Sequence, residues 1–173
     1  RVDKIVGPGN RFVAAAKALV AADCGIDFYA GPTEIVIVSS KGPAAWIAAD
    51  LIAQAEHDPD ARAVLVTPSR QLARAVVREV TRRAPGDGPA RAALKRHGAV
   101  IVTRTINEAM ELPNAAAPEH LVVESEALAR QVRRAGAVFV GPWTAQVAGD
   151  FAIGSNHVLP TAGAARFRGG FNA

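Results

Sequence analysis

Apolar residues gather along the chain in short, continuous runs rather than in alternating apolar and polar positions. The clearest run extends from Ile35 to Val38 and is rich in β-branched side chains. A run without polar alternation is typical of a strand that is covered on both faces, as in a parallel sheet. Further strands are predicted on the same pattern at 61–67, 99–103, 120–124 and 137–141.

Segments with helical composition and helix start signals lie between these runs. The first helix is expected from about Asn10 to Ala22. Ser69 has the position of an N-cap, and Thr105 with Glu108 has the spacing of a capping box. Other helices are expected at 43–57, in a short segment that ends near 97, and at 125–135.

This alternation of strand and helix predicts an α/β fold with a largely parallel sheet, flanking helices and right-handed crossovers. Beyond Gly141 the regular pattern fades, so we expect an irregular, loop-rich C-terminal part that serves function. The 173 residues suffice for one ordinary α/β domain with a small appendage. A domain of this size buries roughly 70% of the surface that its unfolded chain exposes.

The formal net charge of +4 comes from arginine, much of it clustered in one predicted helix. Arg70, Arg74, Arg78 and Arg82 recur every four residues and therefore align on one helix face. A nucleic-acid surface would need further basic elements and stacking aromatics, yet aromatic residues make up only 5% of the chain. We interpret the arginine row as a solvated face and expect no nucleic-acid partner.

The single cysteine, Cys24, excludes an internal disulfide and fits a reducing compartment. The sequence contains no visible signal peptide, and no apolar run approaches the ~20 residues that cross a bilayer. We therefore expect a cytoplasmic protein without a membrane partner.

Two side chains near the end of the predicted helix at 43–57 have the chemistry of metal ligands. Gln54 and His57 are three residues apart, so they project from nearly the same face and can reach one ion, whereas Glu56 points elsewhere. The alternative is that His57 is a surface group stabilised by the helix dipole.

An adjacent carboxylate and imidazole, Glu119 and His120, stand between Pro118 and an apolar run. Two titratable side chains at the mouth of a strand make a candidate functional site. The alternative is a turn-capping glutamate and a hydrogen-bonded core histidine. Their position at the start of a strand counts against a ligand site, because ligands of parallel sheets bind beyond the carboxyl ends of the strands.

The glycine-rich stretch GDFAIGSNH follows the last predicted strand and carries Asp150 and His157. Either can be a loop hydrogen bonder, but a mixed set of glutamine, histidine and aspartate also suits zinc. Ahead of the first helix, the GPGN turn offers backbone N–H groups to an anion. It is not a dinucleotide fingerprint, because the third glycine of that motif would fall at Phe12.

Taken together, the stretches GPGNRFVAAAK, AGPTE, AADLIAQAEHDPDA, AAPEHL, VFVGPWT and GDFAIGSNHVLPT resemble the central and later part of the histidinol dehydrogenase family. The resemblance covers essentially the whole chain. It implies an incomplete Rossmann-like architecture and a zinc-dependent, NAD-dependent oxidation of L-histidinol to L-histidine through the aldehyde.

The resemblance also implies a role for each matching residue. Glu119 and His120 match the acid–base pair, and Asn10 matches a contact to NAD. Zinc ligands and substrate contacts share residues in this family. The zinc ligands correspond to Gln54, His57 and Asp150, and the substrate contacts to Thr33, Gln54, His57, His120 and Asp150.

Thr33 departs from the family pattern, which has serine, so a related alcohol is an alternative substrate. From the family architecture we expect residues 1–34 to finish a smaller nucleotide-binding lobe and residues 35–173 to form the main α/β domain. We expect a homodimer with a shared active site. The chain also looks truncated, because a family histidine ligand and a substrate-binding glutamate lie in a later segment, so alone it should bind zinc weakly and turn over little. A noncatalytic module of the same fold is the other alternative.

Overall fold

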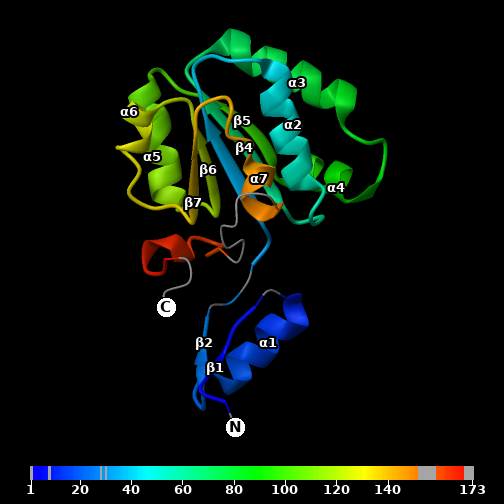
Figure 1. The fold of residues 1–173 in the computed structure, drawn as a ribbon. Coiled ribbons are helices and arrows are strands. Elements are labelled where there is room, and N and C mark those ends of the chain that lie inside the picture. Colours follow the sequence, from blue (N-terminus) through cyan, green and yellow to red (C-terminus); the bar gives the residue numbers. More distant parts are fainter. Residues whose placement is uncertain (1, 8, 28, 30, 152–158, 170–173) are drawn as a thin grey trace.

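The computed structural model describes residues 2–7, 9–27, 29, 31–151 and 159–169, without the side chains of 11, 150 and 151. The N-terminal residues form a small unit with two parallel strands, β1 (Lys4–Ile5) and β2 (Gly25–Ile26), joined by helix α1 (Arg11–Val20). A larger α/β unit follows (Figure 1). The first strand of the larger sheet begins at Glu34. The division into residues 1–34 and 35–173 and the binding of nucleotide by the small unit stay predictions.

The larger unit is built on a five-stranded sheet in the order β5-β4-β3-β6-β7, and every neighbouring pair in it is parallel. This confirms the predicted fold class and the position of every predicted strand. The chain winds outward from the central strand in one direction and then in the other. The strands are β3 (Glu34–Val38), β4 (Arg62–Thr67), β5 (Gly98–Val102), β6 (His120–Val123) and β7 (Ala137–Val140).

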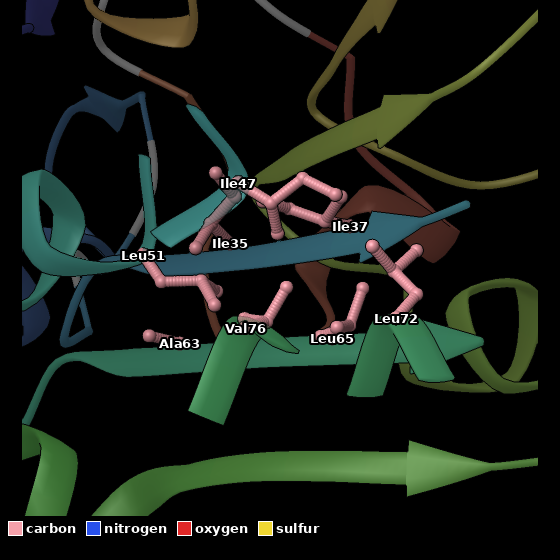
Figure 2. Close-up of a cluster of buried hydrophobic side chains, with 8 residues drawn as sticks. All are labelled: Ile35, Ile37, Ile47, Leu51, Ala63, Leu65, Leu72 and Val76. Atoms are coloured by element: carbon pink, nitrogen blue, oxygen red, sulfur yellow. The ribbon is translucent and has the colours of Figure 1, made fainter. Parts of the chain in front are cut away.

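Helices cover both faces of this sheet, and alternate side chains of β3 divide between the two layers. Ile35 and Ile37 pack with α2 (Ala44–Ala55) and α3 (Arg70–Arg83) in one core cluster (Figure 2). Val36 and Val38 pack with α5 (Ile106–Ala116) and α6 (Glu126–Ala129) in another. Helix α4 (Gly88–His97) packs alongside α2 through small alanines. None of the described helices is long and apolar enough to cross a membrane.

The predicted helix caps form where the sequence signals stand. The hydroxyl of Ser69 accepts a hydrogen bond from the N–H of Leu72 at the start of α3. Thr105 accepts one from the N–H of Glu108 at the start of α5. The reciprocal bond of the capping box is shifted by one residue, because the Glu108 carboxylate accepts from the N–H of Arg104. Each cap satisfies an N–H that the helix itself leaves unpaired.

The prediction of a helix from 125 to 135 was wrong in length, since α6 ends at Ala129. Asn114 on the neighbouring helix explains the early end. Its amide donates to the carbonyl of Gln131 at 3.0 Å, and its Oδ1 accepts from the N–H of Arg133 at 2.7 Å. These bonds occupy backbone groups that would otherwise continue the helix.

Other boundaries also differ from the predictions. The first helix ends at Val20 rather than near Ala22, because the carbonyl of Val20 accepts from the N–H groups of Asp23 and Cys24 in a turn that leads into β2. The C-terminal part is less irregular than expected: it contains α7 (Gln146–Phe151) and a 3-10 helix at Ala164–Arg166. These elements are too short to give a helical period in the sequence.

Candidate active site

Residues from three elements meet at the amino edge of the sheet. Thr33 and Glu34 stand at the start of β3, His120 begins β6, and Gln54 lies at the end of α2. The parallel register sets Ile35 opposite His120. As their positions at strand starts predicted, these residues lie at the edge opposite the usual ligand crevice of parallel sheets. It is also the edge that faces the small N-terminal unit (Figure 1).

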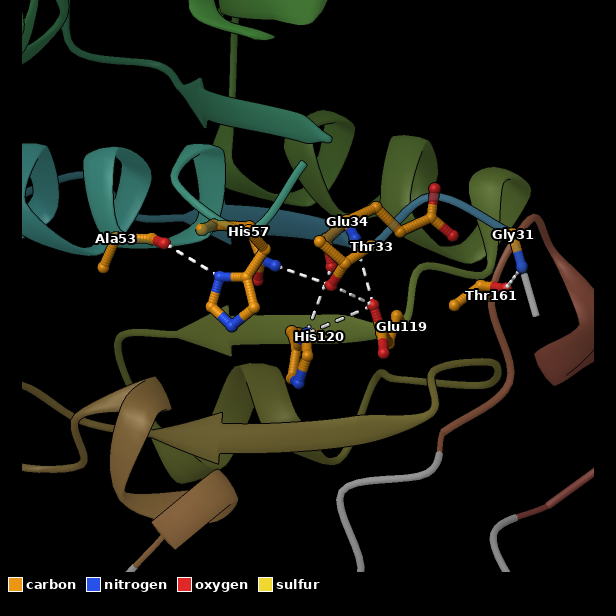
Figure 3. Close-up of polar contacts among 9 residues, drawn as sticks. Gly31, Thr33, Glu34, Ala53, His57, Glu119, His120 and Thr161 are labelled. Atoms are coloured by element: carbon orange, nitrogen blue, oxygen red, sulfur yellow. Dashed lines mark hydrogen bonds and ion pairs between the residues drawn. The ribbon is translucent and has the colours of Figure 1, made fainter. Parts of the chain in front are cut away.

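The carboxylate of Glu119 is buried and held by the start of the central strand. Its Oε2 accepts a hydrogen bond from Oγ1 of Thr33 at 2.5 Å and one from the N–H of Glu34 at 3.0 Å (Figure 3). The side chain of Glu119 is 9% exposed. Two donors on one carboxylate oxygen fix its orientation, which a proton-transferring group needs.

The backbone of Glu119 is held by β7 as firmly as its side chain is held by β3. Its carbonyl accepts from the N–H of Ala137 at 2.8 Å. A Cβ on Gly136 would lie only 2.6 Å from that carbonyl oxygen, so the close approach requires glycine. No motif in the sequence indicates this role of Gly136.

The imidazole of His120 is buried beside Glu119, with Nδ1 3.6 Å from Oε2 of that residue. Nδ1 also lies 3.3 Å from the backbone carbonyl of Glu34. A carbonyl oxygen can only accept, so Nδ1 carries the hydrogen in the neutral ring and Nε2 carries the lone pair. The ring of Phe139 packs at 5.9 Å between centroids. This tautomer makes Nε2 the basic atom of His120.

Gln54 and His57 occupy different environments although their positions are close. Gln54 is fully buried, and its Nε2 donates to Oγ1 of Thr33 at 2.6 Å. His57 lies just beyond the end of α2 and is exposed, with Nδ1 3.0 Å from the carbonyl of Ala53. Hydrogen bonds thus join Thr33, Glu119 and Gln54 in one contact group, and His57 follows Gln54 by three residues.

The atoms of Gln54 and His57 fit a zinc ion. Oε1 of Gln54 is buried and has no hydrogen-bond partner in the described part of the chain. The contact of His57 Nδ1 with a backbone carbonyl leaves Nε2 as the ligating atom, which is the usual arrangement around metal-bound histidine. Among the described residues no cluster of three or more His, Cys, Asp or Glu side chains stands ready for a metal.

Asp150 is the remaining predicted zinc ligand. Its backbone belongs to α7, and its side chain lies outside the described residues. His157 lies wholly outside them.

Asn10 is the N-cap of α1, and its Oδ1 accepts from the N–H groups of Phe12 and Val13. Those donors are therefore engaged, and the Nδ2 group of Asn10 is the one that can donate to a ligand. The turn before Asn10 is anchored by Lys17, whose Nζ donates to the carbonyl of Gly7 at 2.5 Å and to Asp27 at 2.7 Å. Both Lys17 and Asp27 side chains are at most 5% exposed.

Sequence reasoning missed Glu34 altogether. Its backbone N–H binds Glu119 and its carbonyl lies against His120, so this residue touches both members of the pair. Burial raises the pKa of its carboxyl, and the charge of Arg62 on the neighbouring strand opposes that shift. A charged residue that opens an otherwise apolar buried run was the available signal.

A cavity of about 590 Å³ lies at the opposite, carboxyl edge of the sheet. Trp46 and Trp143 meet at its rim with 5.2 Å between ring centroids. Asp50 and Glu124 lie in its wall, and Glu124 is held by the hydroxyls of Ser39 and Ser40. The cavity is separate from the Glu119–His120 group, because the sheet lies between them.

Replacing Asp50 by asparagine is expected to stabilise the fold at pH 7. Burial raises the pKa of Asp50 from its ordinary value of 3.8 to about 6. The folded state therefore holds a proton that the unfolded state releases between these values, and stability falls as pH rises through that window. The gain at pH 7 is up to about 3 kcal/mol in the free energy of unfolding, and it should vanish near pH 4.

Urea unfolding of wild-type and Asp50→Asn chains at pH 4 and pH 7 measures this difference. Asp87→Asn is the control, because Asp87 is exposed and makes no side-chain cap bond. A gain that is equal at both pH values would show that burial of the charge is not its cause.

A model of the histidinol dehydrogenase family matches residues 1–173, the full chain. Histidinol dehydrogenase of Cereibacter sphaeroides is 49% identical over 99% of this chain and 41% of its own length. That of Nitrobacter winogradskyi is 49% identical over 98% of this chain and 41% of its own length. The chain thus spans about two fifths of the length of the curated relatives that it matches.

Solved structures agree with the sequence comparison. The crystal structure of histidinol dehydrogenase from Elizabethkingia anophelis superposes with a TM-score of 0.91 at 33% identity, over 99% of this chain and 41% of that one. Gamma-glutamyl phosphate reductase from Thermotoga maritima shares the fold alone, with a TM-score of 0.55 at 16% identity over 90% of this chain and 45% of that one. The family match over every residue, with the identity of these relatives, establishes that the chain belongs to the histidinol dehydrogenase family.

Proposed function

We propose that this chain carries the acid–base pair of an enzyme that oxidises L-histidinol to L-histidine through the aldehyde, with two NAD⁺ consumed in succession. The observation that carries the proposal is the buried Glu119–His120 pair, oriented by Thr33 and Glu34 at the edge where Gln54 and His57 also lie. Family membership supports the substrate and the oxidoreductase chemistry.

His120 is the base of the first oxidation in this proposal. Its Nε2 takes the proton of the alcohol oxygen while the carbon loses a hydride, and the product is the aldehyde. The contact of Nδ1 with the Glu34 carbonyl keeps the ring in the correct tautomer and stabilises it once it is positively charged.

Glu119 is the base of the second oxidation. Its carboxylate removes a proton from water as the water oxygen bonds to the aldehyde carbon. The hydrated carbon then loses a second hydride, and the carboxylate product forms with release of its proton.

Gln54, His57 and Asp150 would hold zinc, and the Nδ2 group of Asn10 would contact NAD. When bound, zinc supplies a positive charge that orients the substrate and NAD⁺ supplies the hydride acceptor. The buried Oε1 of Gln54 and the carbonyl-anchored ring of His57 support the metal assignment. Residues 1–34 would belong to the nucleotide-binding lobe and residues 35–173 to the catalytic domain of a cytoplasmic homodimer with a shared site.

The test is NADH formation from L-histidinol and NAD⁺ by a full-length protein that carries these 173 residues, with and without a chelator. We expect two NADH per histidinol, loss of activity on chelation and recovery when Zn²⁺ is restored. A panel of other small polar alcohols is assayed alongside, because Thr33 adds a methyl group at a position expected to contact substrate. Activity with another alcohol and none with histidinol would overturn the substrate assignment.

A further inference from the structure

The hydroxyl of Thr33 lies between a predicted metal ligand and a predicted base. Nε2 of Gln54 approaches it at 2.6 Å, and Oε2 of Glu119 lies 2.5 Å away on its other side. These contacts join residues that are 21 and 86 positions apart in the sequence.

The direction of these hydrogen bonds is fixed by chemistry. An amide nitrogen can only donate and an ionised carboxylate can only accept. The Thr33 oxygen therefore accepts from Gln54, and its single hydrogen goes to Glu119. We infer that Thr33 is a positioning residue that links the Gln54 amide and the Glu119 carboxylate in one directed chain, an inference that rests on the proposed function of both.

This chain of hydrogen bonds decides which end of the Gln54 amide is left for a metal. If the amide were reversed, Oε1 would face the Thr33 oxygen and the one hydroxyl hydrogen would have to serve both Gln54 and Glu119. One of the two oxygens would then oppose Thr33 without a hydrogen between them. The observed orientation avoids this conflict and leaves Oε1 buried and unpaired within the described residues.

The same chain of hydrogen bonds couples the predicted metal ligand Gln54 to the predicted base Glu119. A hydrogen bond to a charged group is stronger than one between neutral groups, so ionised Glu119 holds the Thr33 hydroxyl in place and Thr33 in turn holds Gln54. Threonine suits this role because its branched Cβ restricts χ1 and so limits the positions of the hydroxyl. Thr33 is only half-buried, whereas Gln54 and Glu119 are buried.

Two substitutions of Thr33 test the inference. Thr33→Ser retains the hydroxyl, and Thr33→Val retains the shape but removes both hydrogen bonds. Partners that orient metal ligands typically contribute roughly 10–100-fold to metal affinity. We expect Zn²⁺ binding to weaken by about that factor in Thr33→Val and by less than about threefold in Thr33→Ser. Thr81→Val is the control, because the Thr81 hydroxyl bonds only to its own helix, at the carbonyl of Val77.

Zn²⁺ affinity is measured on a full-length protein that carries this chain, by competition with a chromophoric chelator, and circular dichroism checks that each variant is folded. A second readout needs no metal: NMR of the Gln54 side-chain amide. We expect slowly exchanging Nε2 protons in the wild type and in Thr33→Ser, and faster exchange in Thr33→Val.

The two readouts separate the inference from the proposed function. If the wild-type full-length protein does not bind Zn²⁺, the metal assignment fails, and the exchange of the Gln54 amide protons alone tests the role of Thr33. If Zn²⁺ binds but its affinity and the Gln54 amide protons are unchanged in Thr33→Val, the positioning role is wrong while the metal site stands. Weaker binding and loss of amide protection in Thr33→Val, with both preserved in Thr33→Ser, support it.

Discussion

Replacing His120 by asparagine should reduce kcat for L-histidinol by roughly 10²–10⁴-fold in a full-length protein that carries this chain. The amide of asparagine can still donate to the carbonyl of Glu34, which His120 Nδ1 contacts at 3.3 Å. It has no basic nitrogen, however, so the proton of the alcohol has no acceptor. The second oxidation, measured with the aldehyde as the added substrate, should slow much less.

Glu119→Gln should produce the complementary result. Glutamine has the same shape, and its oxygen can accept from Thr33 and from the N–H of Glu34, so the local structure is retained. It cannot take a proton from water. We expect the second oxidation to slow by roughly 10²–10⁴-fold and the yield to fall from two toward one NADH per histidinol under single-turnover conditions.

Stopped-flow absorbance of NADH distinguishes the two steps, with histidinol or the aldehyde as substrate. Glu111→Gln is the matched control, since Glu111 is exposed on α5. Equal losses in both oxidations for both variants would contradict the separate roles. Full activity in either variant would remove that residue from the catalytic assignment.

Lys17→Met should destabilise the small N-terminal unit by about 3–5 kcal/mol. The Lys17 ammonium group and the Asp27 carboxylate are 2.7 Å apart and almost completely buried. Methionine fills similar space but removes the ammonium charge from the Asp27 carboxylate, which also accepts from the N–H of Gly7 at 2.8 Å. Removing one partner of a buried ion pair is far more harmful than removing both.

Amide hydrogen exchange along α1 measures this effect locally, because tryptophan fluorescence reports only on the larger unit, where Trp46 and Trp143 lie. Exchange should accelerate by two to three orders of magnitude, since each 1.4 kcal/mol changes an opening equilibrium about tenfold. Lys4→Met is the control, because Lys4 is exposed in the same unit. Lys17→Met/Asp27→Asn should recover part of the loss. Equal effects of Lys17→Met and Lys4→Met would show that the buried pair contributes little.

The Lys17 contact also has a functional consequence. It anchors the carbonyl of Gly7, three residues before Asn10. If Asn10 contacts NAD as proposed, loosening this turn should raise KM for NAD⁺ more than it lowers kcat. The fold of the small unit and its proposed binding role are therefore linked through one buried lysine.

The sequence alone determined the five strands of the larger sheet, the helices between them and their order. Apolar runs identified each strand of the sheet, and Ser69 and Thr105 marked the starts of their helices. These signals are local, because a strand pattern or a cap depends on residues only a few positions apart. The chemical types of the site residues were also readable, since Gln54, Glu119 and His120 stand in recognisable motifs.

Tertiary structure decided where α6 ends and which side chains meet. Asn114 stops the helix through backbone groups about 17 to 19 residues away, which no local pattern reports. Glu34 meets the Glu119 carboxylate and the His120 ring through its backbone atoms. Backbone contacts do not depend on side-chain identity, so sequence motifs cannot show them.

The environment of the acid–base pair was likewise a tertiary result. Thr33 and Glu119 are 86 residues apart and touch because β3 and β6 pair in a register that sets Ile35 opposite His120. A shift of one residue would turn these side chains to the other face of the sheet. The sequence supplied the reactive groups, and the sheet register supplied their geometry, because only packing fixes contacts between distant segments.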